Sequence, residues 1–199
     1  MKIQIDDIIS FFDSLADSWD AHMIRNEEVI SSILDHAGIR AGIEVLDVAC
    51  GTGVLISDYL KRGVNSVTAI DISPKMAAIA DRKYQRDPRV RVICADATQF
   101  AFGRLFDSII VYNAAPHFAD LGGLITVLAA FLKPEGRLTI AHGMSRAAVN
   151  RHHGNVASTL KKELPAAEEL AAVMNKTLAV EAVISDDRMY LVTGIRKEE

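Results

Sequence analysis

The segment from Val45 to Val54 constrains the fold of this chain more than any other part of its sequence. It reads Val-Leu-Asp-Val-Ala-Cys-Gly-Thr-Gly-Val, an apolar run followed by an acid and a turn with two glycines. This pattern predicts a buried strand ending in a tight turn, where glycine allows a positive φ and a close approach of backbone to ligand. A second acid, Asp71, follows Gly51 by 20 residues, after another apolar run. That distance spans one helix and the next parallel strand, so the two features predict a site for a ribose-bearing cofactor.

The glycine spacing narrows the choice of cofactor. A dinucleotide fingerprint needs a third glycine at the position that Ile56 occupies here. The Gly-Lys-Ser/Thr of a phosphate-binding loop is also missing from this turn. A lone Gly-x-Gly is weak evidence for any one ligand. The remaining alternatives are S-adenosylmethionine and, less favoured, a nicotinamide dinucleotide.

Five motifs in the right order make the chain resemble the class I S-adenosylmethionine-dependent methyltransferases. The first motif of that family, acid-x-Gly-x-Gly-x-Gly, is matched by residues 47–53, with Ala49 at the first glycine. This departure predicts a turn that survives but is slightly less tight. The resemblance covers residues 10–142 and implies a methyltransferase that uses S-adenosylmethionine. The other four matches are Ala69–Met76, Cys94–Ala97, Phe106–Val111 and Leu132–Gly136.

The N-terminal segment adds a finer resemblance. Residues 11–20 resemble the Phe-Asp-x-x-Ala-x-x-Tyr-Asp segment of the small-molecule, type 11 branch, which includes quinone-biosynthesis methyltransferases. Trp19 stands at the tyrosine position. In that branch this segment lies over the cofactor. The resemblance therefore implies that N-terminal helices within residues 1–37 cover the cofactor site, and that the methyl acceptor is a small molecule.

Strand and helix patterns alternate along most of the chain. A parallel sheet covered on both faces follows from such alternation. We expect one domain over residues 1–199 with an α/β fold, a doubly wound Rossmann-like sheet of seven mostly parallel strands, an antiparallel last strand and helices on both faces. The predicted strands are residues 43–48, 66–71, 90–94, 106–112, 136–142, 178–185 and 188–196, and predicted helices include residues 53–62, 73–86 and 121–132.

Residues 143–164 interrupt this alternation. The segment follows the fifth predicted strand, beside the carboxyl ends of the strands, where open α/β sheets bind ligands. We interpret it as an insertion that caps the acceptor site. The alternative is a surface insertion that only aids solubility.

Roles in cofactor binding follow from the spacing and from the family resemblance. Asp71 is expected to hold both ribose hydroxyls, because a carboxylate offers two oxygens to a vicinal diol; its alternative role is to cap the next helix. Asp47 should orient the cofactor ammonium group. The resemblance implies adenine contacts for Ile72, Ala97 and Asp96, and a position facing the methyl group for Asn113. The full predicted set is Trp19, Asp47, Ala49, Cys50, Gly51, Gly53, Asp71, Ile72, Met76, Asp96, Ala97 and Asn113.

Histidines are the candidates for catalysis and acceptor contact. His117 and His142 are predicted near the methyl group, where imidazole can accept a proton from a hydroxyl or thiol. The alternative for His117 is a polar residue at a helix start. His152 and His153 are predicted to contact the acceptor, with solvated polarity as the alternative. No metal is predicted, because the histidine spacing matches no ligand pattern.

Bulk properties exclude several classes of partner. The 199 residues carry a formal net charge of −4, whereas nucleic-acid binding requires a basic face. No apolar run reaches the length of a membrane span, and the N-terminus lacks signal-peptide character, so we expect a cytoplasmic protein without a membrane partner. A homodimer remains open. The rival functions are a non-catalytic cofactor-binding module and an NAD-type oxidoreductase.

Overall fold

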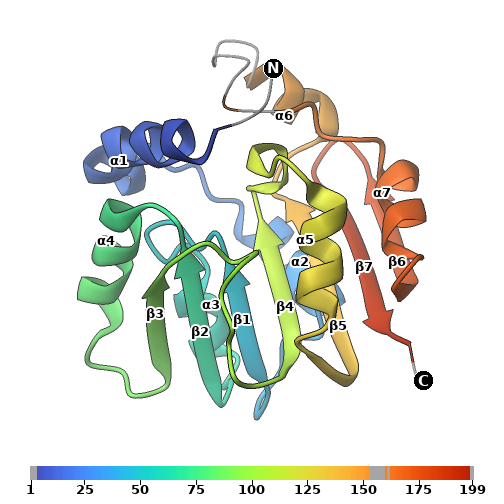
Figure 1. Cartoon of the computed structure of the whole chain (residues 1–199), viewed down its shortest axis with the longest axis horizontal. Helices are drawn as coiled ribbons and strands as arrows, with labels where there is room; N and C mark the ends of the chain where they lie inside the picture. The colour runs from blue at the N-terminus through green and yellow to red at the C-terminus, as the bar shows by residue number, and fades with distance from the viewer. Residues whose placement is uncertain (1–3, 153–159, 161, 198–199) are drawn as a thin grey trace.

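The computed structural model describes residues 4–152, 160 and 162–197. Its centre is a seven-stranded sheet in the order β3-β2-β1-β4-β5-β7-β6 (Figure 1). Strand β7 runs antiparallel to both of its neighbours, and the other pairings are parallel. The strands are β1 (Glu44–Val48), β2 (Ser66–Asp71), β3 (Val90–Cys94), β4 (Phe106–Tyr112), β5 (Leu132–His142), β6 (Leu178–Ser185) and β7 (Tyr190–Arg196). The predicted fold class is confirmed.

Helices cover both faces of the sheet and one of its ends. Helices α5 and α7 pack on one face, and α2, α3 and α4 pack on the other. Helix α1 lies across the end where the parallel strands finish (Figure 1). The helices are α1 (Ile5–His22), α2 (Glu27–His36), α3 (Ile56–Lys61), α4 (Pro74–Tyr84), α5 (Leu121–Ala129), α6 (Arg146–His152) and α7 (Ala167–Met174), with a 3₁₀ turn, η1 (Ala115–His117).

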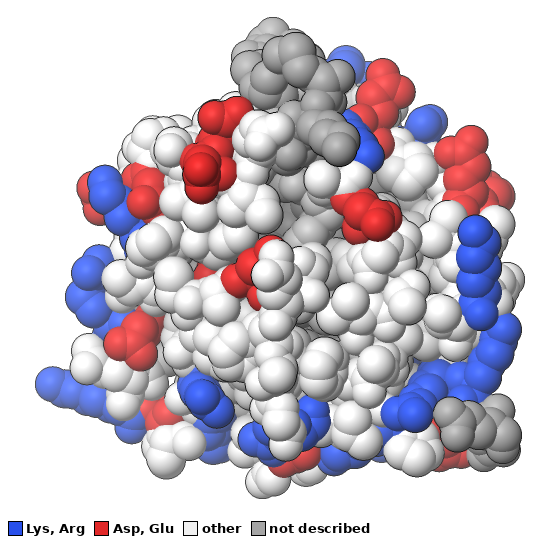
Figure 2. Space-filling model, viewed as in Figure 1, with Lys and Arg blue, Asp and Glu red and all other residues white. Residues whose placement is uncertain are grey.

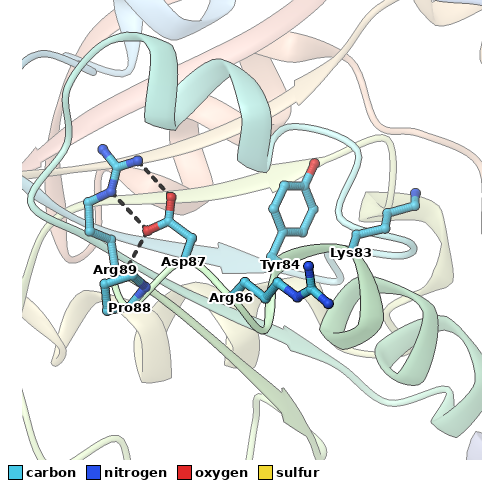
Figure 3. A pocket seen from close by; sticks show the side chains of 6 residues that line it. All are labelled: Lys83, Tyr84, Arg86, Asp87, Pro88 and Arg89. Atoms are coloured by element: carbon cyan, nitrogen blue, oxygen red, sulfur yellow. Dashed lines mark hydrogen bonds and ion pairs between the residues drawn. The ribbon is translucent and has the colours of Figure 1, made fainter.

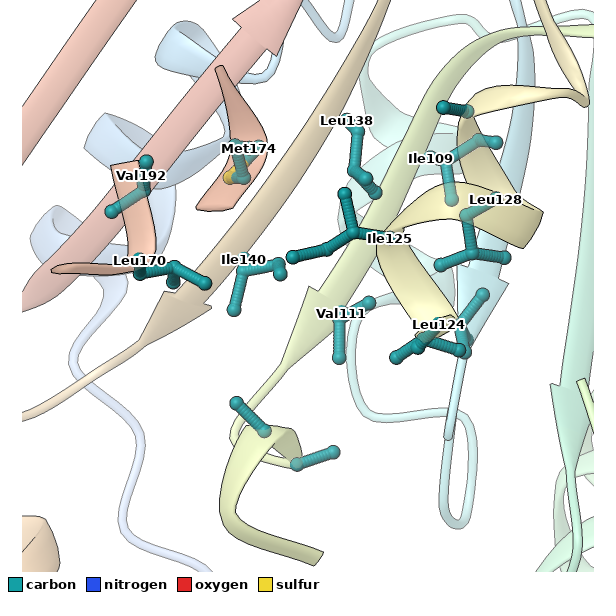
Figure 4. Packing of buried hydrophobic residues seen from close by; sticks show 14 of the residues in the cluster. Ile109, Val111, Leu124, Ile125, Leu128, Leu138, Ile140, Leu170, Met174 and Val192 are labelled. Atoms are coloured by element: carbon teal, nitrogen blue, oxygen red, sulfur yellow. The ribbon is translucent and has the colours of Figure 1, made fainter. Parts of the chain in front are cut away.

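The central strands bury side chains on both faces. On β4, Ile109 and Val111 join the core beneath α5 and α7, whereas Ile110 between them joins the core beneath α2 and α3. Successive side chains on a strand point to opposite faces, so a continuous apolar run such as this one belongs in a sheet covered on both sides. Figure 4 shows the first of these cores, with Leu124 and Leu170 reaching the sheet from α5 and α7.

Local capping explains where several helices begin. The Ser73 hydroxyl accepts a hydrogen bond from the Met76 amide, and Pro74 occupies the first turn of α4, as the sequence predicted. Asp120 caps α5 in the same way, by accepting from the Gly123 amide at 2.9 Å. These caps place the starts of α4 and α5 at the carboxyl end of the sheet.

Several predicted boundaries were wrong. The strand predicted from residue 188 begins at Tyr190, and the helix predicted to reach residue 86 ends at Tyr84. The helix predicted from residue 53 begins at Ile56, because the glycine turn continues that far. The helix predicted to reach residue 132 ends at Ala129, and β5 already begins at Leu132. Phe106 pairs with Leu132 and Ser108 with Arg137, so residues 133–136 bulge within the strand rather than forming a turn before it.

The strand order reverses between β1 and β4, with β2 and β3 on one side and β5 on the other. In open α/β sheets, the carboxyl ends of the strands at such a reversal form a crevice for ligands. Within the described residues, no helix is long and apolar enough to cross a membrane.

Candidate functional site

A large cavity opens at the carboxyl ends of the parallel strands. Its volume is about 1000 Å³, and its walls come from α1, the loops after β1, β2, β3 and β4, and the segment after β5. Most residues predicted from the sequence lie in this wall: Trp19, Asp47, Ala49, Cys50, Gly51, Asp71, Ile72, Met76, Asp96, Ala97, Asn113, His117 and His142.

The glycine turn after β1 adopts left-handed backbone conformations. The φ angles of Ala49, Gly51 and Gly53 are 56°, 56° and 81°. Ala49 thus keeps the conformation of the glycine it replaces, at a cost of about 1–2 kcal/mol for a residue with a Cβ. Gly53 is not among the residues of the cavity wall. A Cβ there would lie 2.9 Å from Cε2 of Tyr84 and 3.0 Å from Cδ1 of Ile56, so Gly53 allows the turn to pack against α4.

Asp71 ends β2 and ties the two predicted motifs together. Its Oδ2 accepts a hydrogen bond from the Gly51 amide at 2.8 Å, and its Oδ1 accepts from the Ser73 amide at 2.9 Å. Each oxygen keeps a second lone pair for a ligand. The side chain is buried, which raises its pKa, and the amides of Ser73 and Gly51 act against this shift. Helix capping and diol binding are therefore compatible roles.

Asp47 lies on β1 and is only 2% exposed. Burial, and then the negative charge of Asp71, raise the pKa of the Asp47 carboxyl to about 8. The nearby Tyr59 hydroxyl acts against this shift, but neither that hydroxyl nor Oδ2 of Asp47 forms a hydrogen bond to a described residue. Buried polar atoms usually have partners. An unpartnered carboxylate oxygen in a cavity wall fits a cationic ligand group such as an ammonium.

Asp96 follows β3 and organises a short turn. Its Oδ1 accepts from the amide and the hydroxyl of Thr98, at 2.8 and 2.7 Å. Ala97 and Ile72 line the cavity beside it. The turn shows that Asp96 has a structural role, and its place in the wall agrees with the predicted contact to adenine.

Helix α1 is attached across the cavity by two aspartates. Oδ1 of Asp13 accepts from the Ser73 hydroxyl at 2.5 Å and from the Lys75 amide at 3.1 Å. Asp20 accepts from the Thr52 hydroxyl at 2.6 Å and lies 2.5 Å from the Lys83 ammonium group. These contacts join α1 to the glycine turn and to both ends of α4, so α1 covers the glycine turn.

His117 lies in η1 and lines the cavity. Its Nδ1 is 2.9 Å from the carbonyl oxygen of Leu160. A carbonyl only accepts, so Nδ1 carries the proton and the lone pair of the neutral ring is on Nε2. The ring packs edge-to-face on Phe12, with 5.0 Å between centroids. His142, at the end of β5, is buried and packs against Tyr190.

Asn113 connects the ends of β4 and β5. Its φ is 55°, and its Oδ1 accepts from the Gly143 amide at 2.9 Å. A Cβ on Gly143 would clash with the Tyr112 hydroxyl, so a larger residue there would require the Tyr112 side chain to move. Tyr112 also lines the cavity, and the sequence analysis missed it.

Other wall residues missed by the sequence analysis are apolar or lie on α1. Their signal in the sequence is weak, because apolar residues on an amphipathic helix usually face a core. They include Ile8, Phe12, Leu15, His22, Phe118, Leu124, Val127, Met144 and Val149. Of the predicted acceptor residues, His153 lies outside the described residues, as does the side chain of His152.

A second, shallow hollow lies at the end of α4 (Figure 3). Two of its cations have acidic partners, since Arg89 pairs with Asp87 at 2.7 Å and Lys83 pairs with Asp20. No cluster of three potential metal ligands occurs in the described parts of the chain.

Comparison with known proteins decides the family. The sequence profile of a methyltransferase domain matches residues 45–136, which include the glycine turn, Asp71 and Asp96. The chain belongs to the class I S-adenosylmethionine-dependent methyltransferases. The resemblance stated from the five motifs is confirmed.

Curated relatives share the domain but are longer. A malonyl-[acyl-carrier protein] O-methyltransferase of Acetivibrio thermocellus is 29% identical over 133 residues, covering 65% of this chain and 47% of its own length. A demethylmenaquinone methyltransferase of Tropheryma whipplei is 33% identical over 103 residues, covering 52% of this chain and 43% of its own. This chain therefore spans less than half the length of these relatives.

A solved structure shows the same fold. The N-methyltransferase NodS of Bradyrhizobium japonicum, in complex with S-adenosyl-L-homocysteine, superposes with a TM-score of 0.74 at 18% identity. The match covers 98% of this chain and 99% of the other. The sheet order and the antiparallel β7 thus belong to a methyltransferase fold.

Proposed function

We propose that this protein transfers a methyl group from S-adenosylmethionine to a small-molecule acceptor by in-line displacement. The observation that supports this most is the joint arrangement of Gly51, Asp71 and Asp47 at one cavity wall. Asp71 has free lone pairs for a ribose diol, and Asp47 has a buried oxygen for an ammonium group. Bound S-adenosylmethionine would supply an activated methyl group, which the acceptor takes as the carbon–sulfur bond breaks.

The described residues would act mainly by positioning. Holding reactants in line contributes roughly 7–11 kcal/mol in favourable cases. Helix α1, with Trp19 and Phe12, covers the cavity and would exclude water. Where the attacking atom is a hydroxyl or thiol, the imidazole of His117 is the proposed proton acceptor, because this residue lines the cavity.

The segment 143–164 supports the proposed cap. Met144 and Val149 line the cavity, and the Lys162 amide donates to the Pro116 carbonyl at 2.8 Å, next to His117. We also retain the proposals of a cytoplasmic location, of a catalytic role for His142, and of acceptor contacts by His152 and His153. Relatives of this chain are named for an acyl-carrier-protein acceptor and for a quinone precursor, and both kinds of acceptor belong in the first screen.

Turnover tests the proposal. The purified chain is incubated with S-adenosylmethionine labelled in the methyl group and a panel of small hydroxyl, thiol and amine compounds. Label transfer with formation of S-adenosylhomocysteine is expected for at least one compound. Tight cofactor binding without transfer across the panel would favour the rival function, a non-catalytic cofactor-binding module.

A further inference from the structure

The end of the cavity beyond the glycine turn has an apolar wall. Its side chains come from α1, from α5 and its preceding loop, and from the segment after β5. Burial of this surface by a ligand is favourable at about 25 cal/mol per Å². The apolar set is Ile5, Ile8, Phe12, Leu15, Phe118, Leu124, Val127, Met144 and Val149.

Among the described residues of the same wall, histidines apart, the groups that carry a full charge at neutral pH are carboxylates. Asp71 and Asp96 line the cofactor end, and Asp120 lies at the start of α5, beside the apolar set. Asp47 is not counted with them, because the pKa of its carboxyl is raised to about 8 in the ligand-free fold. Figure 2 shows one face of the molecule, with several acidic side chains over the upper part and a few Lys and Arg among them at the upper right. Most Lys and Arg of this face lie at the lower and outer edges. An anion that enters this cavity would lose its hydration, which costs free energy. It would also be repelled by the carboxylates of the wall.

Asp120 does not provide a good site for a cation either. Its Oδ1 accepts from the Gly123 amide at the N-terminus of α5, where the helix dipole already compensates a negative charge. Phe12 and His117 pack edge-to-face on each other and line the same cavity. An uncharged molecule with a large apolar or aromatic surface suits such a wall best.

On these grounds we propose that the acceptor is an uncharged, largely apolar molecule, and that the carboxylates and apolar residues of the wall select against anionic acceptors. This inference rests on the proposed function. It restricts the class of acceptor by its charge, a property that the shared methyltransferase fold does not determine.

An isosteric pair of probes tests it. The compounds 3-hydroxy-2-naphthamide and 3-hydroxy-2-naphthoate have nearly the same shape and the same hydroxyl, and differ in charge at neutral pH. Their binding to the protein saturated with S-adenosylhomocysteine is measured by calorimetry and ligand-observed NMR. We expect the amide to bind at least tenfold more tightly. Equal binding, tighter binding of the carboxylate, or saturable binding of neither probe would overturn the inference.

A charge insertion provides the matched control. Met144 lines the cavity and is 40% exposed, so Met144→Lys can be accommodated without burying the new charge completely. It should reduce the preference for the amide at least threefold, whereas Met144→Leu should leave the preference unchanged. A preference that Met144→Lys does not alter would contradict the electrostatic origin. If the wild-type protein did not bind S-adenosylhomocysteine, that result would instead refute the proposed function itself.

Discussion

At the scale of single residues, Asp71 is the point where two motifs 20 residues apart meet. It holds the Gly51 and Ser73 amides and keeps acceptor capacity for a diol. Asp71→Asn should weaken S-adenosylhomocysteine binding at least tenfold, because an amide nitrogen cannot accept a hydrogen bond. Calorimetry measures the change, and circular dichroism checks the fold. Asp186→Asn, in the exposed turn before β7, is the control and should bind normally. Unchanged affinity in a folded Asp71 variant would contradict the assignment.

Asp47 gives a prediction for stability against pH. Its carboxyl ionises near 4 in an unfolded chain and at about 8 in the ligand-free fold. The folded state therefore holds the extra proton between these values, and the free energy of unfolding falls as pH rises through that window. Besides Asp71, the groups that influence this carboxyl include Tyr59.

Asp47→Asn should remove this loss and raise the melting temperature of the ligand-free protein at pH 8. Each kcal/mol gained corresponds to about 2–4 °C in a chain of this size. The same variant should bind S-adenosylhomocysteine less well. Asp107→Asn is the control, and it should lower the melting temperature at pH 8. Lys133 and the Glu44 amide lower the pKa of Asp107 against the effect of burial, so its ionised carboxylate stabilises the fold. A melting temperature for Asp47→Asn below the wild-type value at pH 8 would argue against the proposed protonation.

At the scale of elements, helix α1 depends on polar contacts as much as on apolar packing. Ile8 and Ala16 are its only described residues that are fully buried, whereas Asp13 and Asp20 attach it to the Ser73 and Thr52 hydroxyls. An element held in this way can open without disrupting the cores on the two sheet faces. It therefore has the properties of a cover over the cofactor end.

The double variant Asp13→Ala, Asp20→Ala should speed dissociation of S-adenosylhomocysteine severalfold while the core stays intact. Trp19, the only tryptophan of the chain, lines the cavity, so its fluorescence reports the bound state in stopped-flow displacement. Hydrogen exchange should increase within residues 5–22. Asp17→Ala, at an exposed position of the same helix, is the matched control. Identical dissociation rates in both variants would show that the two aspartates do not hold α1 over the ligand.

At the scale of the whole molecule, cofactor binding should be visible as stability. A ligand that binds only the folded state at 100 times its dissociation constant adds about 2.7 kcal/mol. For a chain of this size, that corresponds to a rise of roughly 5–11 °C in melting temperature. S-adenosylhomocysteine should produce this shift, and NADH should not. A shift with NADH alone would support the oxidoreductase alternative.

Much of this architecture could be predicted from the chain alone. Apolar runs predict the central strands clearly, because a strand that is buried on both faces has no polar side. The Ser73-Pro74 pair likewise predicts the start of α4. Boundaries were less secure where a local pattern allows two structures. The bulge at residues 133–136 depends on pairing with β4, which is distant in sequence, and no local pattern encodes that pairing.

The sequence by itself determined the cofactor end of the cavity, because its glycine turn and the acid that closes β2 sit at fixed positions relative to strand ends. Tertiary structure alone decided the rest. It turned Gly53 toward Tyr84 instead of the cavity, and it gathered Phe12, Leu124 and Met144 into one wall. It also left a buried oxygen of Asp47 without a hydrogen-bond partner among the described residues. These three features have the same physical reason, because each depends on which side chains the folded chain brings together from distant segments. In addition, nothing in the local sequence indicates whether an apolar residue will face a core or a ligand.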